Sequence, residues 1–146
     1  MKKLESSTFA HASGKGDVKV GGLVPRPIIS HIVKVIPHLE QRYRTMGDYI
    51  READGTVTIS VSHTGNPDVN FIVSLHEMIE EYLTHKRGIP EPVIFRFDID
   101  HPELDDPGMD PRAPYHREHF FCDIIDRLLC EQLGITYEFY QEVEPL

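Results

Sequence analysis

The segment LHEMIEEYL (residues 75–83) places ionisable side chains inside a helical repeat of apolar residues. At about 100° per residue, the apolar side chains gather on one broad face: Phe71, Ile72, Leu75, Met78, Ile79, Tyr82 and Leu83. Glu77 and Glu81 fall on the opposite side, which we expect to face solvent. His76 and Glu80 lie at the margin of the apolar face. The segment therefore predicts a long helix with an imidazole and a carboxylate beside its buried side.

His76 and Glu80 are four residues apart, so their side chains stack on successive helical turns. An imidazole and a carboxylate in that relation can bind one metal ion, as the two histidines of a His-Glu-x-x-His helix do. The alternative interpretation is a histidine that is hydrogen-bonded at the edge of the core and a glutamate that is solvated. A second signal further along the chain bears on this choice.

Residues 114–134 form a second helical segment, which begins with Pro114 and ends with Gly134. Its apolar residues cover more than half of the circumference, which predicts burial on more than one side: Phe120, Phe121, Ile124, Ile125, Leu128 and Leu129. A narrow polar stripe remains, which consists of Tyr115, His119, Asp123, Asp126 and Cys130. A buried polar group without a partner costs about 1 to 3 kcal/mol, so this stripe requires partners.

His119 and Asp123 repeat the spacing of His76 and Glu80. Two helices packed about 8 to 10 Å apart would bring two imidazoles and two carboxylates together, a ligand set that suits Zn²⁺, Mn²⁺ or Fe²⁺. We therefore predict His76, Glu80, His119 and Asp123 as ligands of a divalent metal, with zinc as the first choice. The alternative is a metal-free network in which His119 hydrogen-bonds to Asp126 or to a glutamate of the first helix.

The rest of the chain predicts a single α+β domain. Segments that are rich in β-branched residues, or that alternate apolar and polar residues, predict strands at residues 28–36, 48–51 and 56–62. We expect a small antiparallel sheet covered on one face by the two long helices, with a short C-terminal helix at residues 135–141. Residues 94–100 predict a further short strand. Residues 98–110 predict an acidic, proline-rich loop, a candidate for an extra oxygen ligand or a lid.

Composition and charge exclude several kinds of partner. The 146 residues, 40% hydrophobic and 27% charged, fit one globular domain at residues 26–146, preceded by a polar, glycine-rich tail at residues 1–25 that we expect to be flexible. A net charge of −9 without a basic stripe argues against nucleic acid and anionic lipid as partners. No apolar run suits a membrane span or a signal peptide, so we expect a cytoplasmic protein. Cys122 and Cys130 lie about 12 Å apart along a helix, too far to pair with each other.

Two patterns resemble a set of small uncharacterised bacterial and phage proteins: His76-Glu77-x-x-Glu80 followed by Lys86-Arg87-Gly88-Ile89, and Asp110-Pro111-x-Ala113-Pro114-Tyr115-x-x-Glu118-His119. This resemblance brings no established activity. More distantly, a strand leading into a helix that opens with His-Glu is similar to the zincin metallopeptidases. That resemblance implies that His76 is a metal ligand and that Glu77 is the general base that activates water. The chain departs from the zincin pattern at Glu80, where zincins have their second histidine.

Three function classes follow from these patterns. The first is a metal-dependent hydrolase of unknown substrate, with His76, Glu80 and His119 as ligands, Asp123 as fourth ligand or base, and Glu77 as the catalytic base that zincins suggest. The second is a non-catalytic interaction protein, of the kind that phages encode, in which these residues form a structural metal site or a buried polar network. The third is an all-helical nucleotide pyrophosphohydrolase, against which the predicted strands argue. An open coordination position beside a pocket favours the enzyme.

Overall fold

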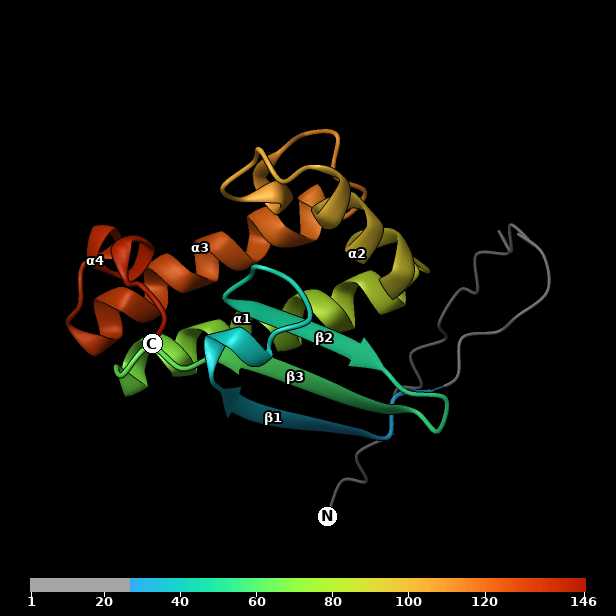
Figure 1. Ribbon diagram of the computed structural model, residues 1–146, viewed down its shortest axis with the longest axis horizontal. Coiled ribbons are helices and arrows are strands. Elements are labelled where there is room, and N and C mark those ends of the chain that lie inside the picture. Colours follow the sequence, from blue (N-terminus) through green and yellow to red (C-terminus); the bar gives the residue numbers. More distant parts are fainter. Residues whose placement is uncertain (1–26) are drawn as a thin grey trace, which may run out of the picture.

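The computed structural model describes residues 27–146, so the predicted N-terminal tail at residues 1–25 lies outside the described residues. The strands are β1 (Ser30–Ile36), β2 (Gly47–Arg51) and β3 (Thr56–Ser62), and the helices are α1 (Pro67–Lys86), α2 (Glu91–Asp100), α3 (His116–Leu133) and α4 (Tyr137–Glu142). Short 3-10 turns lie at His38–Glu40 and Pro107–Met109. Figure 1 shows the sheet with its helices. The predicted α+β class, with two long helices and a short C-terminal helix, is confirmed.

The sheet is mixed, so the prediction of a wholly antiparallel sheet is wrong. Strands β2 and β3 form an antiparallel hairpin that turns at Gly55, whose φ of 95° favours glycine. Strand β1 pairs with the other edge of β3 and runs parallel to it, which gives the order β1-β3-β2. Residues 37–46 carry the chain past the position of β3. Strand patterns indicate which residues are extended, but they do not indicate which strand occupies the middle.

The central strand is buried and the first strand is not. The inward side chains of β3 are at most 1% exposed: Val57, Ile59 and Val61. In β1, whose β-branched sequence is typical of a buried strand, three apolar side chains are 40–45% exposed: Ile32, Val33 and Val35. The reason is that β1 is an edge strand and α1 packs mainly beneath β2 and β3. The β-branched residues of β1 therefore indicate an extended backbone and do not indicate burial.

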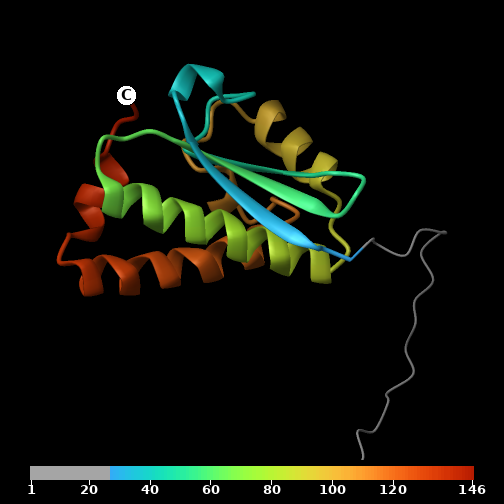
Figure 2. The same ribbon diagram turned by 90° about the horizontal axis from the view of Figure 1, so that it is seen from below.

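Helix α1 lies between the sheet and α3, as Figure 2 shows. It begins where the side chain of Asn66 accepts hydrogen bonds from the backbone N–H groups of Asp68 and Val69, at 2.9 and 3.2 Å. Pro67 occupies the first helical position, where no N–H is required. Helix α3 ends at Gly134 in the left-handed conformation, with a φ of 71°. Within residues 27–146, no helix has the length and apolar character that crossing a membrane requires.

The predicted buried face of α1 is only partly correct. Ile72 is fully buried, but Phe71 and Tyr82 are 49% and 47% exposed. The buried side instead includes His76, Glu80 and the predicted solvent-facing Glu81. The buried face differs from the predicted one because α1 contacts the sheet on one side and α3 on the other. Both neighbours offer polar partners to its side chains.

Helix α3 shows the same pattern. The polar stripe is buried as predicted, including Asp126, which is 3% exposed. The prediction that its apolar residues are buried on more than one side is wrong, because four of them are 43–54% exposed: Phe120, Phe121, Ile124 and Leu128. Helix α3 therefore turns its polar side inward and much of its apolar side outward.

The prediction of a strand at residues 94–100 is wrong, because this segment is part of helix α2. Pro90 and Pro92 stand where a helix starts, which favours that conformation. Ile94 and Phe97 are three residues apart and both pack on the core, as one face of a helix requires. Alternation over so few residues does not distinguish a strand from a helix.

Candidate metal centre

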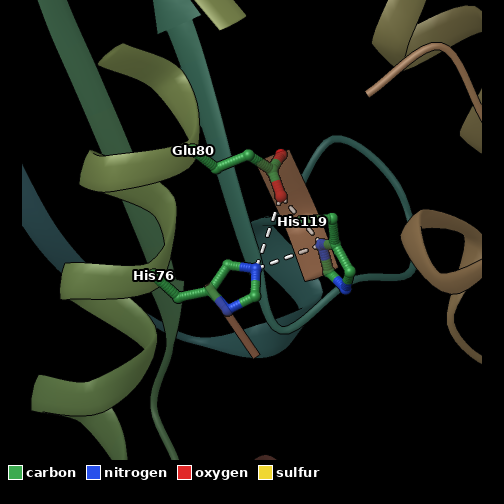
Figure 3. A group of neighbouring side chains, drawn as sticks. All are labelled: His76, Glu80 and His119. Carbon is green, nitrogen blue, oxygen red and sulfur yellow. Dashed lines mark hydrogen bonds and ion pairs between the residues drawn. The ribbon is translucent and has the colours of Figure 1, made fainter. Parts of the chain in front are cut away.

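Three side chains from α1 and α3 point toward one another (Figure 3). His76 Nε2 lies 3.4 Å from Glu80 Oε2 and 3.1 Å from His119 Nδ1, and His119 Nδ1 lies 2.8 Å from Glu80 Oε2. These ligand atoms all lie within 4.8 Å of one another. His76 and Glu80 are buried, and His119 has a side chain that is 15% exposed. The geometry brings together three of the four predicted ligands.

The outer nitrogen of each imidazole is bonded to a carboxylate. His76 Nδ1 lies 2.7 Å from Asp126 Oδ2, and His119 Nε2 lies 3.0 Å from Asp106 Oδ1. An ionised carboxylate only accepts hydrogen bonds, so each outer nitrogen carries the proton and donates it. In a neutral ring the inner nitrogen then has no proton, and its lone pair faces the centre. Metal-binding histidines are usually oriented in this way by a second carboxylate.

The centre requires a cation. Two neutral rings would present lone pairs to each other and to the Glu80 carboxylate, which is repulsive unless a proton or a metal ion lies between them. Within the described part of the chain, no lysine or arginine pairs with Glu80. The cation must therefore come from solvent.

Without a metal, protons fill this role. Burial lowers the pKa of His119, but hydrogen bonds to Asp106 and Glu80 outweigh it and raise this pKa to about 10. Burial likewise opposes protonation of His76, while contacts with Asp126 and Glu80 raise its pKa above the usual range. Burial raises the pKa of Glu80, yet hydrogen bonds from the two histidines bring it to about 2. The metal-free centre thus combines an ionised carboxylate with a protonated imidazole.

Two tyrosines hold the carboxylates of the centre. The Tyr49 hydroxyl donates to Glu80 Oε1 at 3.3 Å, which leaves Oε2 for the histidines. The Tyr140 hydroxyl donates to Asp126 Oδ2 at 3.2 Å. Tyr49 and Tyr140 come from β2 and α4, so elements on two sides of α1 and α3 position the acidic groups.

Asp123, the predicted fourth ligand, has other partners. Its carboxylate accepts hydrogen bonds from the Tyr137 hydroxyl and from Arg127 Nε, the latter at 3.1 Å. It is not among the ligand atoms that converge on the centre. Asp126, which we considered as a partner of His119, contacts His76 instead. Both aspartates lie on the predicted polar stripe, and the way the helices cross decides which of them reaches a histidine.

Glu77, the predicted catalytic base, does not face open solvent as its helical projection suggested. It packs against Gly47 at the start of β2, so closely that a Cβ at position 47 would overlap its side chain. Burial raises the pKa of its carboxyl to about 8, and the charge of Glu80 adds to this effect. Glu77 and the three converging side chains line one cavity of about 880 Å³.

Sequence reasoning did not identify individual residues of the loop that contacts His119. Asp106 bonds to the outer nitrogen of this ring, and Gly108 lies against the ring with no room for a side chain. Nearby, Asp98 accepts hydrogen bonds from Tyr115 and Tyr43 at 2.5 and 2.9 Å. The acidic composition of residues 98–110 was the available signal, but it does not distinguish one aspartate from another.

Comparison with known proteins gives no match to a family model, a curated protein or a solved structure. The resemblances to small bacterial and phage proteins and to zincins therefore stay predictions. The geometry of the three side chains and their cavity is what supports a function.

Proposed function

We propose that this protein is a metal-dependent hydrolase whose ion is bound by His76, Glu80 and His119. The observation that carries the proposal is that two carboxylates turn both imidazoles so that their free nitrogens converge on Glu80 Oε2. No lysine or arginine of the described residues pairs with Glu80 at this point. Two imidazole nitrogens and one carboxylate oxygen are a common ligand set of catalytic zinc, with manganese and iron as alternatives.

Three protein ligands favour a catalytic site over a structural one. Structural zinc sites are usually closed by four protein ligands, whereas catalytic sites keep one position for water or substrate. The cavity of about 880 Å³ beside the three ligands gives a substrate access to that position. A Zn²⁺ ion held there would supply a Lewis acid that makes water nucleophilic near neutral pH.

Glu77 is the proposed general base. It follows His76 directly in the sequence and lines the same cavity as the three ligands. In its ionised form, Glu77 would accept a proton from the attacking water and return it to the leaving group. This is also the role that the zincin resemblance assigns to the glutamate after the first histidine.

The second candidate is a non-catalytic protein in which the same residues form a buried polar network. One observation favours it: Glu80 contacts His119 and Asp126 contacts His76 directly, without an ion between them. In that case protons balance the charge permanently, and added metal would change neither stability nor activity.

The test uses zinc-loaded protein and a panel of hydrolysable probes: fluorogenic peptides, carboxylic esters and phosphodiesters. We expect turnover of one class that a chelator abolishes. Glu77→Gln should lower its rate by about 10²- to 10⁴-fold with the metal content unchanged. Glu138→Gln, an exposed position on α4, is the matched control and should alter neither. Full activity in Glu77→Gln would show that Glu77 is not the general base. Full activity in His76→Ala would show that hydrolysis does not occur at the proposed metal site.

A further inference from the structure

The outward face of α3 carries an apolar stripe whose side chains are about half exposed. It consists of Phe120, Phe121, Ile124 and Leu128, which are 47%, 46%, 43% and 54% exposed. The opposite side of the helix contacts α1 through His119 and Asp126, so the stripe points away from the rest of the domain. Figure 2 shows α3 as the outermost layer, with α1 between it and the sheet. Contiguous exposed apolar residues of this kind mark interaction surfaces.

Charged residues of opposite sign lie at the two ends of the stripe. Arg117 and Glu131 are both exposed, and neither forms an ion pair within residues 27–146. Each is seven residues from Ile124, which corresponds to about 10 Å along the helix axis on either side. The face therefore has an unpaired positive residue at one end, apolar residues in the middle and an unpaired negative residue at the other end, where the exposed Arg127 is already paired with Asp123.

Such a face is complementary to itself in the antiparallel orientation. A two-fold axis beside Ile124 would place Phe120 of one copy against Leu128 of the other, and Arg117 of each copy against Glu131 of the other. The same residues supply both sides of every contact, which is the property of an interface between identical chains. No partner of different sequence is needed to explain the charge pattern.

We propose that this chain forms a two-fold symmetric homodimer through the outward face of α3. The stripe lies on the side of α3 opposite to His119 and Asp126, so pairing leaves the metal cavity of each copy open. The dimer is independent of the proposed hydrolase activity, because none of its contact residues binds metal or lines the cavity.

The first test is the mass of the full chain in solution, measured by analytical ultracentrifugation. We expect twice the chain mass of 16.8 kDa at micromolar concentrations. Ile124→Glu, which puts a charge on the two-fold axis, should give the single-chain mass. Leu39→Glu is the matched control, because Leu39 is 96% exposed on the 3-10 turn far from α3 and should leave the dimer intact. A monomeric wild-type chain, or a dimer that Ile124→Glu does not affect, would overturn the proposal.

The second test reverses the charges and does not alter the apolar contacts. Arg117→Glu places like charges together at both ends of the interface and should raise the dimer Kd at least about tenfold. Adding Glu131→Arg restores opposite charges and should return the Kd to near the wild-type value. Circular dichroism confirms that each variant is folded. A double variant that dimerises no better than Arg117→Glu alone would contradict the predicted register.

Discussion

Glu80 and Glu81 are neighbours on α1 and are both buried, 4% and 0% exposed, yet their charges are balanced in different ways. Glu81 accepts a hydrogen bond from Arg51 Nε at 2.9 Å and contacts His31 Nε2 at 2.8 Å. Arg51 also donates to Thr84 Oγ1 at 2.7 Å. Glu80 has two histidines and a tyrosine as partners. One carboxylate thus has a permanent cation from its own chain, and the other depends on protons or a metal ion.

This difference separates a structural ion pair from a candidate binding site. The Arg51–Glu81 cluster links β1, β2 and α1, and its guanidinium is a covalent part of the chain. The Glu80 centre links α1 and α3, and its charge balance changes with pH and with available metal. Stability that depends on the Arg51 cluster should therefore be constant under conditions that change the contribution of the Glu80 centre.

The largest expected effect is the loss of the Arg51 cation. Arg51→Ala leaves the Glu81 carboxylate buried without its guanidinium, which should lower the free energy of unfolding by about 3 to 5 kcal/mol. Urea denaturation measures this loss, which should be equal with and without a chelator. Arg96→Ala is the control, because the side chain of Arg96 is 71% exposed and its pair with Asp100 spans 3.8 Å. A loss for Arg51→Ala as small as for Arg96→Ala would contradict the structural role.

Metal removal should produce the next largest effect. Free metal a thousandfold above Kd stabilises the folded chain by about 4 kcal/mol, and each kcal/mol shifts Tm by roughly 2 to 8 °C for a domain of this size. A chelator should therefore lower the Tm of metal-loaded protein by roughly ten degrees or more, and added Zn²⁺ should restore it. Glu80→Ala should show no response to either treatment. An identical Tm for loaded and chelated wild-type protein would favour the plain hydrogen-bonded network.

Sequence patterns were sufficient for the three strands, for helices α1, α3 and α4 and for the three converging side chains, but not for α2, which was predicted as a strand. The cap at Asn66 and the stop at Gly134 define the long helices, and the alternation in residues 56–62 defines β3. The spacing of His76 and Glu80 places both on one side of α1, and His119 is the residue on α3 that matches them. These features depend on local periodicity, which a sequence contains.

Features that depend on packing between elements could not be predicted. The burial of Glu81 requires Arg51, which is 30 residues earlier in the chain and reaches α1 only because β2 lies beside it. The choice of Asp126 over Asp123 as partner of His76 depends on the crossing of two helices. The lateral order of the strands and the outward apolar face of α3 depend in the same way on which elements become neighbours.

The two forms of the centre should respond to pH with opposite signs. In metal-free protein the pKa of His119 is raised to about 10 from an ordinary 6.5. Its stabilising contribution is therefore complete below the ordinary value and is lost as pH rises toward 10. In metal-loaded protein, protons compete for the histidines, so the stabilisation by metal decreases as pH falls. The Tm difference between loaded and metal-free protein should increase with pH in calorimetric scans, and a constant difference would contradict this account.

The smallest expected effect comes from the carboxylates that orient the histidines. Asp126→Asn and Asp106→Asn should each weaken metal binding about 10- to 100-fold, as measured by competition with a chromophoric chelator. Asp123→Asn should leave the Kd unchanged, because Asp123 contacts Tyr137 and Arg127 rather than a histidine. The opposite result, a loss of affinity only in Asp123→Asn, would identify Asp123 as the fourth ligand that the sequence suggested.

Metal content tests the central claim most directly. Protein purified without a metal column and dialysed against Zn²⁺ should contain one equivalent by mass spectrometry. His76→Ala, Glu80→Ala and His119→Ala should each lose it, whereas His85→Ala, near the end of α1, should retain it. A full equivalent in the three ligand variants, or none in the wild-type protein, would show that these side chains do not bind a metal.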